Sequence, residues 1–492
     1  MAQITLSQLE AHLWEAANIL RGPVDASDFK TYIFPLLFFK RISDVYDEEL
    51  TATVDEYGVD FPESHRFQVP YGSHWNEIRK LTKNVGQALQ AAMHNIEKAN
   101  AALLHNIFGD AQWSNKDRLS DATLIDLIEH FSHLNLSNSA VEPDVLGQAY
   151  EYLIKKFADA SNKKAGEFYT PRSIVTLMMG ILDPIPGETV YDPACGTGGM
   201  LLEAINHVQA KGERVEMLFG RLFGQEKNLT TSSIARINLF LHGIEDFHIV
   251  RGDTLRQPAF YNDDELQQFD VVIANPPFSL EQWGVDVWES DRFKRNFAGL
   301  PSNKNGDFAW VQHMITSMKS DRGRMAVVLP HGVLFRMGIE GKIRQQILEM
   351  DLLEAVIGLG ANLFYGTGLA ACILVFRAQK MPDRREKVLM IDASRLYLRG
   401  RNQNTLEPDH VEHIRAWYQA FEDVEGHAKV ATLEEIADND WNLNIPRYVE
   451  PIIEEETISV EQALDNLRQS LETAYEAEDH LTQLLRDAGL ME

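Results

Sequence analysis

The sequence is poor in three features, and each shortage excludes a class of protein. Its 492 residues include only two cysteines, Cys195 and Cys372, so we expect neither a disulfide framework nor a structural zinc site, and a reducing cytoplasm fits. No run of about eighteen apolar residues occurs, which argues against a membrane span. The first twenty residues, MAQITLSQLEAHLWEAANIL, carry no basic stretch ahead of an apolar one, so we expect no export.

Positive charge is also scarce. The chain has 46 lysines and arginines against 73 acidic residues, a formal net charge of -27. A protein that binds DNA alone normally carries a basic face, which displaces counterions from the phosphates. This chain is therefore expected to repel DNA on average. Either DNA is not its substrate, or another chain supplies most of the electrostatic attraction.

The hydrophobic pattern predicts a helical part followed by an α/β part. Residues 1–150 are typical of a helical bundle, because apolar residues recur at helical intervals, as in Leu6, Leu9, Leu13, Ala16 and Leu20. From about residue 185, short apolar strands alternate with helical stretches, which favours an α/β fold with a mostly parallel sheet and helices on both faces. We predict up to seven strands: TVYDPA, RLFGQE, FHIVRGD, FDVVIANPP, RMAVVLP, LLEAVIGL and AACILVFR.

These patterns suggest four segments. We expect an N-terminal helical domain over 1–150, an α/β domain over 151–400, a C-terminal extension over 401–456 and a helix over 457–492. The last segment carries a heptad-like stripe amid many acids, formed by Leu464, Leu467, Leu471, Ala474, Leu481 and Leu485. That stripe suits either a helix that pairs with another chain or a surface helix docked on its own domain.

Residues 189–205, TVYDPACGTGGMLLEAI, predict a strand, a glycine-rich turn and a helix. Asp192 ends the strand, and glycines in the turn let the backbone approach a ligand closely or adopt positive φ. The turn itself contains Gly196, Thr197, Gly198 and Gly199. The spacing is not that of the dinucleotide fingerprint and no Walker lysine follows, so a phosphate cradle is not favoured.

Acidic residues also end the next two strands. Glu226, in FGQEKN, is placed to accept hydrogen bonds from ribose hydroxyls, and Asp253, in RGDTL, could accept one from an adenine amino group. Alone, each acid is more often a helix cap or a solvated turn residue. Together with Asp192, at three successive strand ends, they predict a nucleoside site without phosphate.

Residues 166–172, GEFYTPR, precede the first strand and lead into an apolar helix. One interpretation is a helix start, with Thr170 as cap and Pro171 in the first turn. The other is a lid, in which Phe168, Tyr169 and Thr170 fold over the cofactor.

Asn275, Pro276, Pro277 and Phe278 follow the fourth strand. The prolines cannot continue a ladder and stiffen the turn, so the Asn275 side chain and the Pro276 carbonyl offer two fixed acceptors. These could take both hydrogens of a planar amino group and leave its nitrogen pyramidal and nucleophilic, while Phe278 offers a stacking face. Catalysis would then rest on positioning and exclusion of water, without a general base. The alternative is a structural turn with a core phenylalanine.

In the order GEFYTPR, DPACGTGG, NPPF, the sequence resembles the gamma arrangement of the adenine-N6 DNA methyltransferases. LWEAANILRG, FKTYIFPLLFFKRISDVYDE and WNLNIPRYVE further resemble the modification subunit of type I restriction-modification systems, over nearly the whole chain. The resemblance implies a Rossmann-like sheet, S-adenosylmethionine as cofactor, no metal, and a target adenine flipped out of duplex DNA and held by residues 275–278. With the strand-end acids, the expected cofactor residues are Glu167, Phe168, Tyr169, Thr170, Pro171, Arg172, Asp192, Gly196, Thr197, Gly198, Gly199, Glu226 and Asp253.

The resemblance also offers a reason for the acidic charge. Two copies of such a modification subunit pair with one specificity subunit, which reads the DNA, and a translocating restriction subunit can join them. Two local basic clusters could face phosphate or could be solvated loops: Arg292, Lys294 and Arg295, and Arg395, Arg399 and Arg401.

Three other functions stay open. The same tetrapeptide serves methylation of a glutamine amide in a protein or of an amino group in RNA, although those enzymes look shorter and lack the long helical flanks. A non-catalytic scaffold is a second alternative, against which the intact Asn275, Phe278 and glycine turn argue. A self-sufficient methyltransferase with its own recognition domain is the third, and the acidic charge and the short stretch after the last strand speak against it.

Overall fold

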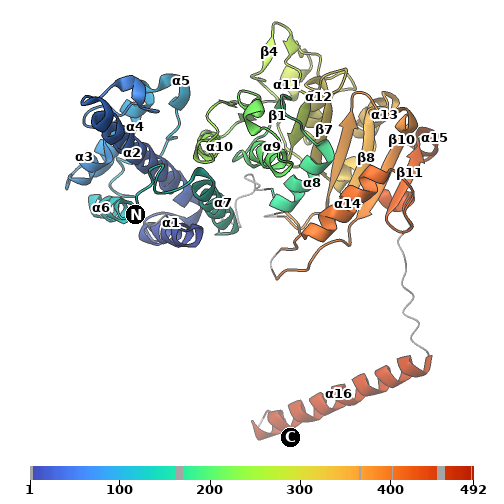
Figure 1. The fold of residues 1–492 in the computed structure, drawn as a ribbon. Helices are drawn as coiled ribbons and strands as arrows, with labels where there is room; N and C mark the ends of the chain where they lie inside the picture. Colours follow the sequence, from blue (N-terminus) through green and yellow to red (C-terminus); the bar gives the residue numbers. More distant parts are fainter. Residues whose placement is uncertain are drawn as a thin grey trace. The chain divides into compact units, whose positions relative to one another are not determined.

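The structure is a computed structural model that describes residues 4–160, 170–364, 367–401, 403–450, 460–488 and 490–491. The chain separates into two compact units, Met1–Glu450 and Pro451–Glu492 (Figure 1). In these described ranges, no helix combines the length and the apolar character that a membrane crossing requires.

The N-terminal part is helical, as the periodicity predicts. The first helix begins at a capping box in which Thr5 and Gln8 exchange hydrogen bonds, and it buries Leu9, Leu13, Ala16 and Leu20. The helices are α1 Leu6–Leu20, α2 Phe29–Tyr57, α3 Trp75–Arg79, α4 Val85–Ala99, α5 Ala101–Leu104, α6 Asp121–Ser132 and α7 Pro143–Ala160.

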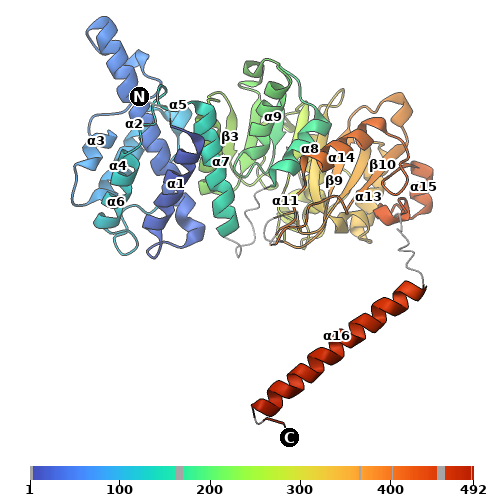
Figure 2. The same cartoon turned by 60° about the horizontal axis from the view of Figure 1, so that its bottom comes forward.

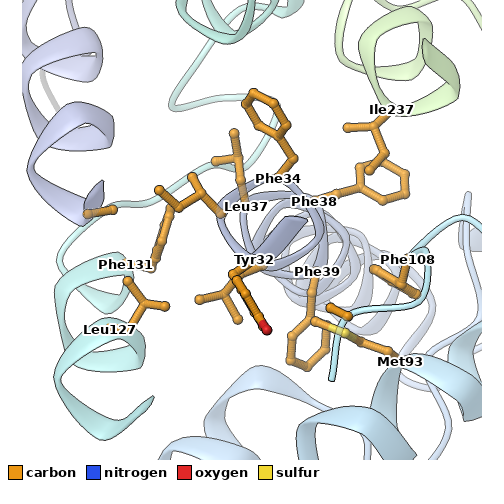
Figure 3. Packing of buried hydrophobic residues seen from close by; sticks show 14 of the residues in the cluster. Tyr32, Phe34, Leu37, Phe38, Phe39, Met93, Phe108, Leu127, Phe131 and Ile237 are labelled. Atoms are coloured by element: carbon orange, nitrogen blue, oxygen red, sulfur yellow. The ribbon is translucent and has the colours of Figure 1, made fainter. Parts of the chain in front are cut away.

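Helix α2 is the centre of this part. Its residues from Tyr32 to Ser43 are all buried, which is typical of a helix surrounded by other elements. Figure 3 shows its aromatic side chains pointing to several sides of the helix. Phe38 lies toward Ile237 of α10 (Leu229–Leu241), a helix of the α/β part. The same hydrophobic core therefore joins the helical part to the sheet.

The sheet contains all seven predicted strands and two more. In spatial order they are β3 His248–Arg251, β2 Leu222–Glu226, β1 Val190–Asp192, β6 Val271–Ala274, β7 Arg324–Pro330, β9 Ala371–Arg377, β8 Leu353–Leu359, β10 Lys387–Ala393 and β11 Ala428–Thr432. Pairing is parallel except around β9 and at the β10–β11 edge. A small hairpin, β4 Tyr261–Asn262 and β5 Glu265–Leu266, stands apart.

Helices cover both faces of the sheet, so its strands are apolar on both sides. Along β6, Val271 and Ile273 pack with α8 Arg172–Leu182, α9 Gly199–Ala210 and α14 Pro408–Ala420. Val272 and Ala274 face α12 Asp307–Thr316, α13 Ile339–Glu349 and α15 Leu433–Asp438. Figure 2 shows α8 and α14 over one face. The predicted α/β class is thereby confirmed.

Several short elements complete the first unit. These are α11 Val285–Trp288 and the 3-10 turns Ala26–Asp28, Pro62–Ser64, Val215–Leu218, His331–Leu334, Pro382–Arg384 and Ile445–Arg447. The second unit contains α16 Val460–Asp487, so the expected helix is present. Its leucine stripe is exposed: Leu464, Leu467, Leu471 and Leu481 have exposed fractions of 48, 55, 44 and 57%.

Candidate active site

A cleft of about 660 Å³ lies beyond the carboxyl ends of β1, β2, β3 and β6. That volume is within the range of about 300 to 1,000 Å³ found for small-molecule sites. The loops after these four strands line the cleft together with residues of α2, α7 and α12. The fold therefore brings together side chains from residue 30 to residue 310.

The glycine-rich turn after β1 adopts the backbone that its sequence predicts. Gly196 has φ of 52° and Gly198 has φ of 80°, conformations that other residues rarely adopt. A Cβ on Gly198 would lie 3.4 Å from Ala235 of α10, so the turn also packs closely on its neighbour. The amide of Gly196 donates to Oε2 of Glu226 at 3.2 Å, which ties the turn to the end of β2.

Glu226 is held by backbone donors and still lines the cleft. Its Oε1 accepts a hydrogen bond from the amide of Asn228 at 2.8 Å, in addition to the bond from Gly196. Burial raises the pKa of this carboxyl, while the bonds from Asn228 and Gly196 lower it. A carboxylate has about four acceptor positions, so this one can accept further hydrogen bonds from a ligand's hydroxyls.

The other two strand-end acids differ in environment. Asp192 is 2% exposed and accepts a hydrogen bond from the amide of Ala194 at 3.0 Å. Burial above all, helped by the charge of Glu226, raises the pKa of Asp192 to about 8. Asp253 lines the cleft and pairs with Lys227, whose Nζ lies 2.9 Å from Oδ2. Asp192 is therefore buried and does not line the cleft, whereas Asp253 does.

Asn275 presents an acceptor that no described residue uses. Its Nδ2 donates to the hydroxyl oxygen of Thr170 at 2.9 Å, which fixes the plane of the amide. Its Oδ1 is buried and has no hydrogen-bond donor among the described residues. A buried acceptor left without a donor costs free energy, about 1 to 3 kcal/mol. This oxygen is therefore suited to a donor that arrives with a ligand.

The residues after Asn275 are rigidly held. Pro277 lines the cleft, and the ring of Phe278 meets the ring of Phe364 edge to face at 6.0 Å between centroids. Ser279 has φ of 49°, and its amide donates to Oδ1 of the buried Asp307 at 2.7 Å. These contacts fix the direction of the turn that carries Asn275.

The structure brings some of the predicted residues to the cleft and places others nearby. Those that line it are Gly196, Thr197, Glu226, Asp253, Asn275 and Pro277. Thr170 contacts Asn275, whereas the side chain of Arg172 is 62% exposed and lies 3.9 Å from both Glu151 and Glu203. Pro171, Asp192, Gly198, Gly199, Pro276 and Phe278 do not line the cleft. Glu167, Phe168 and Tyr169 lie outside the described residues.

Sequence reasoning missed the helical part of the cleft lining. It consists of side chains from two helices, among them Lys30 and Phe34 of α2 and Ile154 and Phe157 of α7. Trp310 of α12 lines the cleft as well. Helical periodicity marks such apolar residues as buried, but it does not say what they face. No signal in the sequence distinguishes them from the ordinary core.

The two basic clusters are mostly exposed, with one exception. Arg292, Lys294, Arg395, Arg399 and Arg401 are exposed, and the guanidinium of Arg292 lies 4.3 Å from the ring centroid of Tyr261.

Arg295 is fully buried, unlike the other members of the basic clusters. Its Nη2 lies 2.8 Å from Oδ1 of Asp291, and its two terminal nitrogens donate to the carbonyls of Thr254 and Leu255 at 3.1 and 3.0 Å. The expectation that it faces phosphate is therefore wrong, because its guanidinium already holds the loop after β3.

Comparisons with known proteins agree with this geometry. The family model for N-6 DNA methylase matches residues 141–457, and that for the HsdM N-terminal domain matches residues 9–131. The MjaVII type I restriction enzyme methylase subunit of Methanocaldococcus jannaschii is 31% identical over 94% of this chain and 82% of its own length. The HindI methylase subunit of Haemophilus influenzae is 33% identical over 78% of this chain and 85% of its own length.

A solved structure is similar as well. The type I restriction-modification methyltransferase subunit of Streptococcus thermophilus superimposes with a TM-score of 0.77 at 32% identity, over 91% of this chain and all of the other. The fold and the cleft at its sheet edge thus define a methyltransferase. The chain belongs to the N-6 DNA methylase family, and within it to the methylase subunits of type I restriction enzymes.

Proposed function

We propose that this chain transfers a methyl group from S-adenosylmethionine to the N6 amino group of an adenine rotated out of duplex DNA. The sequence of that DNA would be read by a separate specificity subunit. The observation that carries the proposal is the buried Oδ1 of Asn275, which has no donor among the described residues and lies in a cleft that also holds Glu226 and the glycine-rich turn.

The cleft suits the proposed cofactor. When bound, S-adenosylmethionine supplies a methyl group activated on a sulfonium. Glu226 keeps free acceptor capacity in the cleft and would bind the ribose hydroxyls, and Asp253 would accept from the adenine amino group. The glycine-rich turn, with Gly196 and Thr197 at the surface of the cleft, allows close approach of the methionine part.

The target base would bind on the other side of the cleft. The Oδ1 of Asn275 would accept one hydrogen of the amino group. Pro276 and Phe278 do not line the cleft themselves but adjoin Asn275 and Pro277, which do; the carbonyl of Pro276 would accept the second hydrogen, and Phe278 would give the purine a stacking face. The turn is already rigid, because Ser279 and Phe364 hold its end. Little reorganisation is then needed for in-line transfer. The nitrogen loses its proton after it gains the methyl group.

Other chains would complete the enzyme. We propose that two copies of this chain bind one specificity subunit, that a restriction subunit can join, and that the exposed leucine stripe of α16 is a pairing surface. The proposed segments are 1–150, 151–400, 401–456 and 457–492, but the first boundary falls within α7, and the third segment contributes β11 to the sheet. The net charge of -27 supports this division of labour, because an acidic subunit needs a partner to attract DNA.

Cofactor affinity should rise with pH and level off above about pH 8. The pKa of Asp192 is raised to about 8, so this carboxyl is largely protonated at neutral pH. A cofactor with net positive charge favours the ionised form, so binding below that pKa releases a proton and strengthens as pH rises toward it. Calorimetry in buffers of different ionisation enthalpy measures the release.

Asp192→Asn is the matched variant for this prediction. It removes the titrating proton, so both the proton release and the pH dependence of Kd should disappear. A wild-type Kd that stays constant between about pH 6 and 8 contradicts the prediction.

Replacing Arg292 and Lys294 together with alanine should weaken DNA binding by the complex with its specificity subunit. Both side chains are exposed. The slope of log K for DNA binding against log salt concentration should become shallower by about 0.9 for each phosphate that is no longer neutralised. Titration of fluorescent duplex DNA at several salt concentrations measures the slope. Lys98→Ala, at an exposed lysine of α4, is the control, and an unchanged affinity and slope in the double variant refute the assignment.

Methyl transfer from labelled cofactor tests the proposal as a whole. The chain is co-expressed with its specificity subunit and incubated in parallel with duplex DNA, with total RNA and with a protein extract. We expect label in DNA alone. Label only in RNA or protein supports the alternative methyltransferases, whereas cofactor binding without any transfer supports a scaffold.

A further inference from the structure

Trp310 carries a second unsatisfied polar group in the cleft. The residue lines the cleft and is 6% exposed, and its indole N–H is buried without an acceptor among the described residues. An indole N–H that is buried usually finds a partner. The two neighbouring tryptophans do so, since Trp283 donates to the carbonyl of Ser302 at 2.8 Å and Trp288 to that of Leu255 at 2.7 Å.

Trp310 is connected to the Asn-Pro-Pro-Phe turn through its own helix. The helix that carries it, α12, is tied to that turn at its first residues. Gly306 donates to the carbonyl of Leu280 at 3.0 Å, and Asp307 accepts from the amide of Ser279. Trp310 also shares a small apolar cluster with Leu280, and both line the cleft.

Within the part of the chain that the structure describes, the cleft thus offers a buried acceptor, on Asn275, and a buried donor, on Trp310, that have no partner. Adenine presents the complementary pair, because its exocyclic amino group donates and the ring nitrogens beside it, N1 and N7, accept. Guanine and thymine carry a carbonyl where adenine has its amino group and do not offer this pair. Cytosine does offer it, with its amino group beside N3, so the pair excludes guanine and thymine only.

We infer that the indole N–H of Trp310 donates to N1 or N7 of the target adenine while Asn275 accepts from the amino group. This inference rests on the proposed function. Trp310 would then be a specificity residue that fixes the rotation of the base in its plane. It would thereby direct the amino nitrogen toward the methyl donor.

A cycle of protein variants and base analogues tests this contact. The target adenine is first located by mapping the methylated positions in DNA from cells that express the complex. Duplexes are then made with 1-deazaadenine or 7-deazaadenine at that position, which replace N1 or N7 by carbon and keep the amino group. The kcat/KM for DNA is measured with the wild-type complex and with Trp310→Phe, which keeps an aromatic ring and removes the N–H. Trp283→Phe is the matched control, since it removes a buried indole N–H that already has a partner.

We expect one of the two analogues to lower kcat/KM about tenfold more in the wild type than in Trp310→Phe. In Trp283→Phe, that analogue should lower kcat/KM by the same factor as in the wild type. Cofactor affinity should be the same in all three proteins. If each analogue lowers kcat/KM by the same factor in the wild type and in Trp310→Phe, the inference is overturned. A loss of cofactor affinity in Trp310→Phe without any coupling to an analogue also overturns it, because the N–H would then serve the cofactor. If the wild-type complex methylates no DNA, the proposed function fails, and this inference fails with it.

Discussion

Replacing Asn275 with alanine should lower kcat for methyl transfer to DNA by about 10²- to 10³-fold. The variant loses the one buried acceptor of the cleft that has no donor among the described residues. It also loses the bond from Nδ2 to Thr170. The amino group of the base would keep a single acceptor and a planar nitrogen, which is a poor nucleophile. Single-turnover assays with the assembled complex measure the loss directly.

Cofactor affinity should change little in Asn275→Ala, because Glu226, Asp253 and the glycine-rich turn stay intact and only the bond to Thr170 is lost. Asn206→Ala is a suitable control, since Asn206 lies on α9, outside the residues that line the cleft. Its activity should match the wild type. An Asn275→Ala variant with nearly normal kcat, or one whose only defect is a weaker cofactor Kd, would sink the assignment of this side chain to the target base.

Replacing Glu226 with glutamine should raise the Kd of the cofactor about ten- to hundredfold, since hydrogen bonds to charged groups contribute about 1.5 to 3 kcal/mol. Glutamine keeps the size of the side chain and one acceptor oxygen, so the bonds from Gly196 and Asn228 need not both be lost. The effect should therefore fall on the ligand more than on the fold. Calorimetry gives Kd, and thermal unfolding without cofactor gives the change in stability.

A cofactor analogue without the ribose 2′-hydroxyl separates the two explanations for such an effect. If Glu226 binds the ribose, removal of the hydroxyl should weaken binding in the wild type but add little in Glu226→Gln. Glu216→Gln, at an exposed position of the turn before β2, controls for charge alone. Equal losses on removal of the hydroxyl in wild type and variant would show that Glu226 acts only by holding the glycine-rich turn.

The strands and the cleft edge could be predicted from sequence because the information is local. Each of the seven predicted strands is a short apolar run that ends near a polar or turn-forming residue, and parallel strands bring such ends to one edge. Of the two strands missed, β10 is an almost wholly buried apolar run that the same rule could have found. β11 is an edge strand with a partly exposed pattern, and its signal is weak.

The rest of the site depends on contacts that no local pattern encodes. The side chains of Phe34 and Phe157 recur at helical intervals like their neighbours, and only the packing of α2 and α7 brings them to the cleft. The burial of Arg295 is of the same kind, because the carbonyls of Thr254 and Leu255 that it binds lie about forty residues away in the sequence. The unpaired N–H of Trp310 could not be foreseen, since it depends on which carbonyls surround it.

The chemical identity of the methylated product tests the central claim most directly. DNA incubated with the wild-type complex and labelled cofactor is digested to nucleosides and analysed by mass spectrometry. The account predicts that the label appears as N6-methyldeoxyadenosine, and that it is absent with Asn275→Ala. Label in a methylated cytosine, or an undiminished yield of N6-methyldeoxyadenosine from Asn275→Ala, would contradict it.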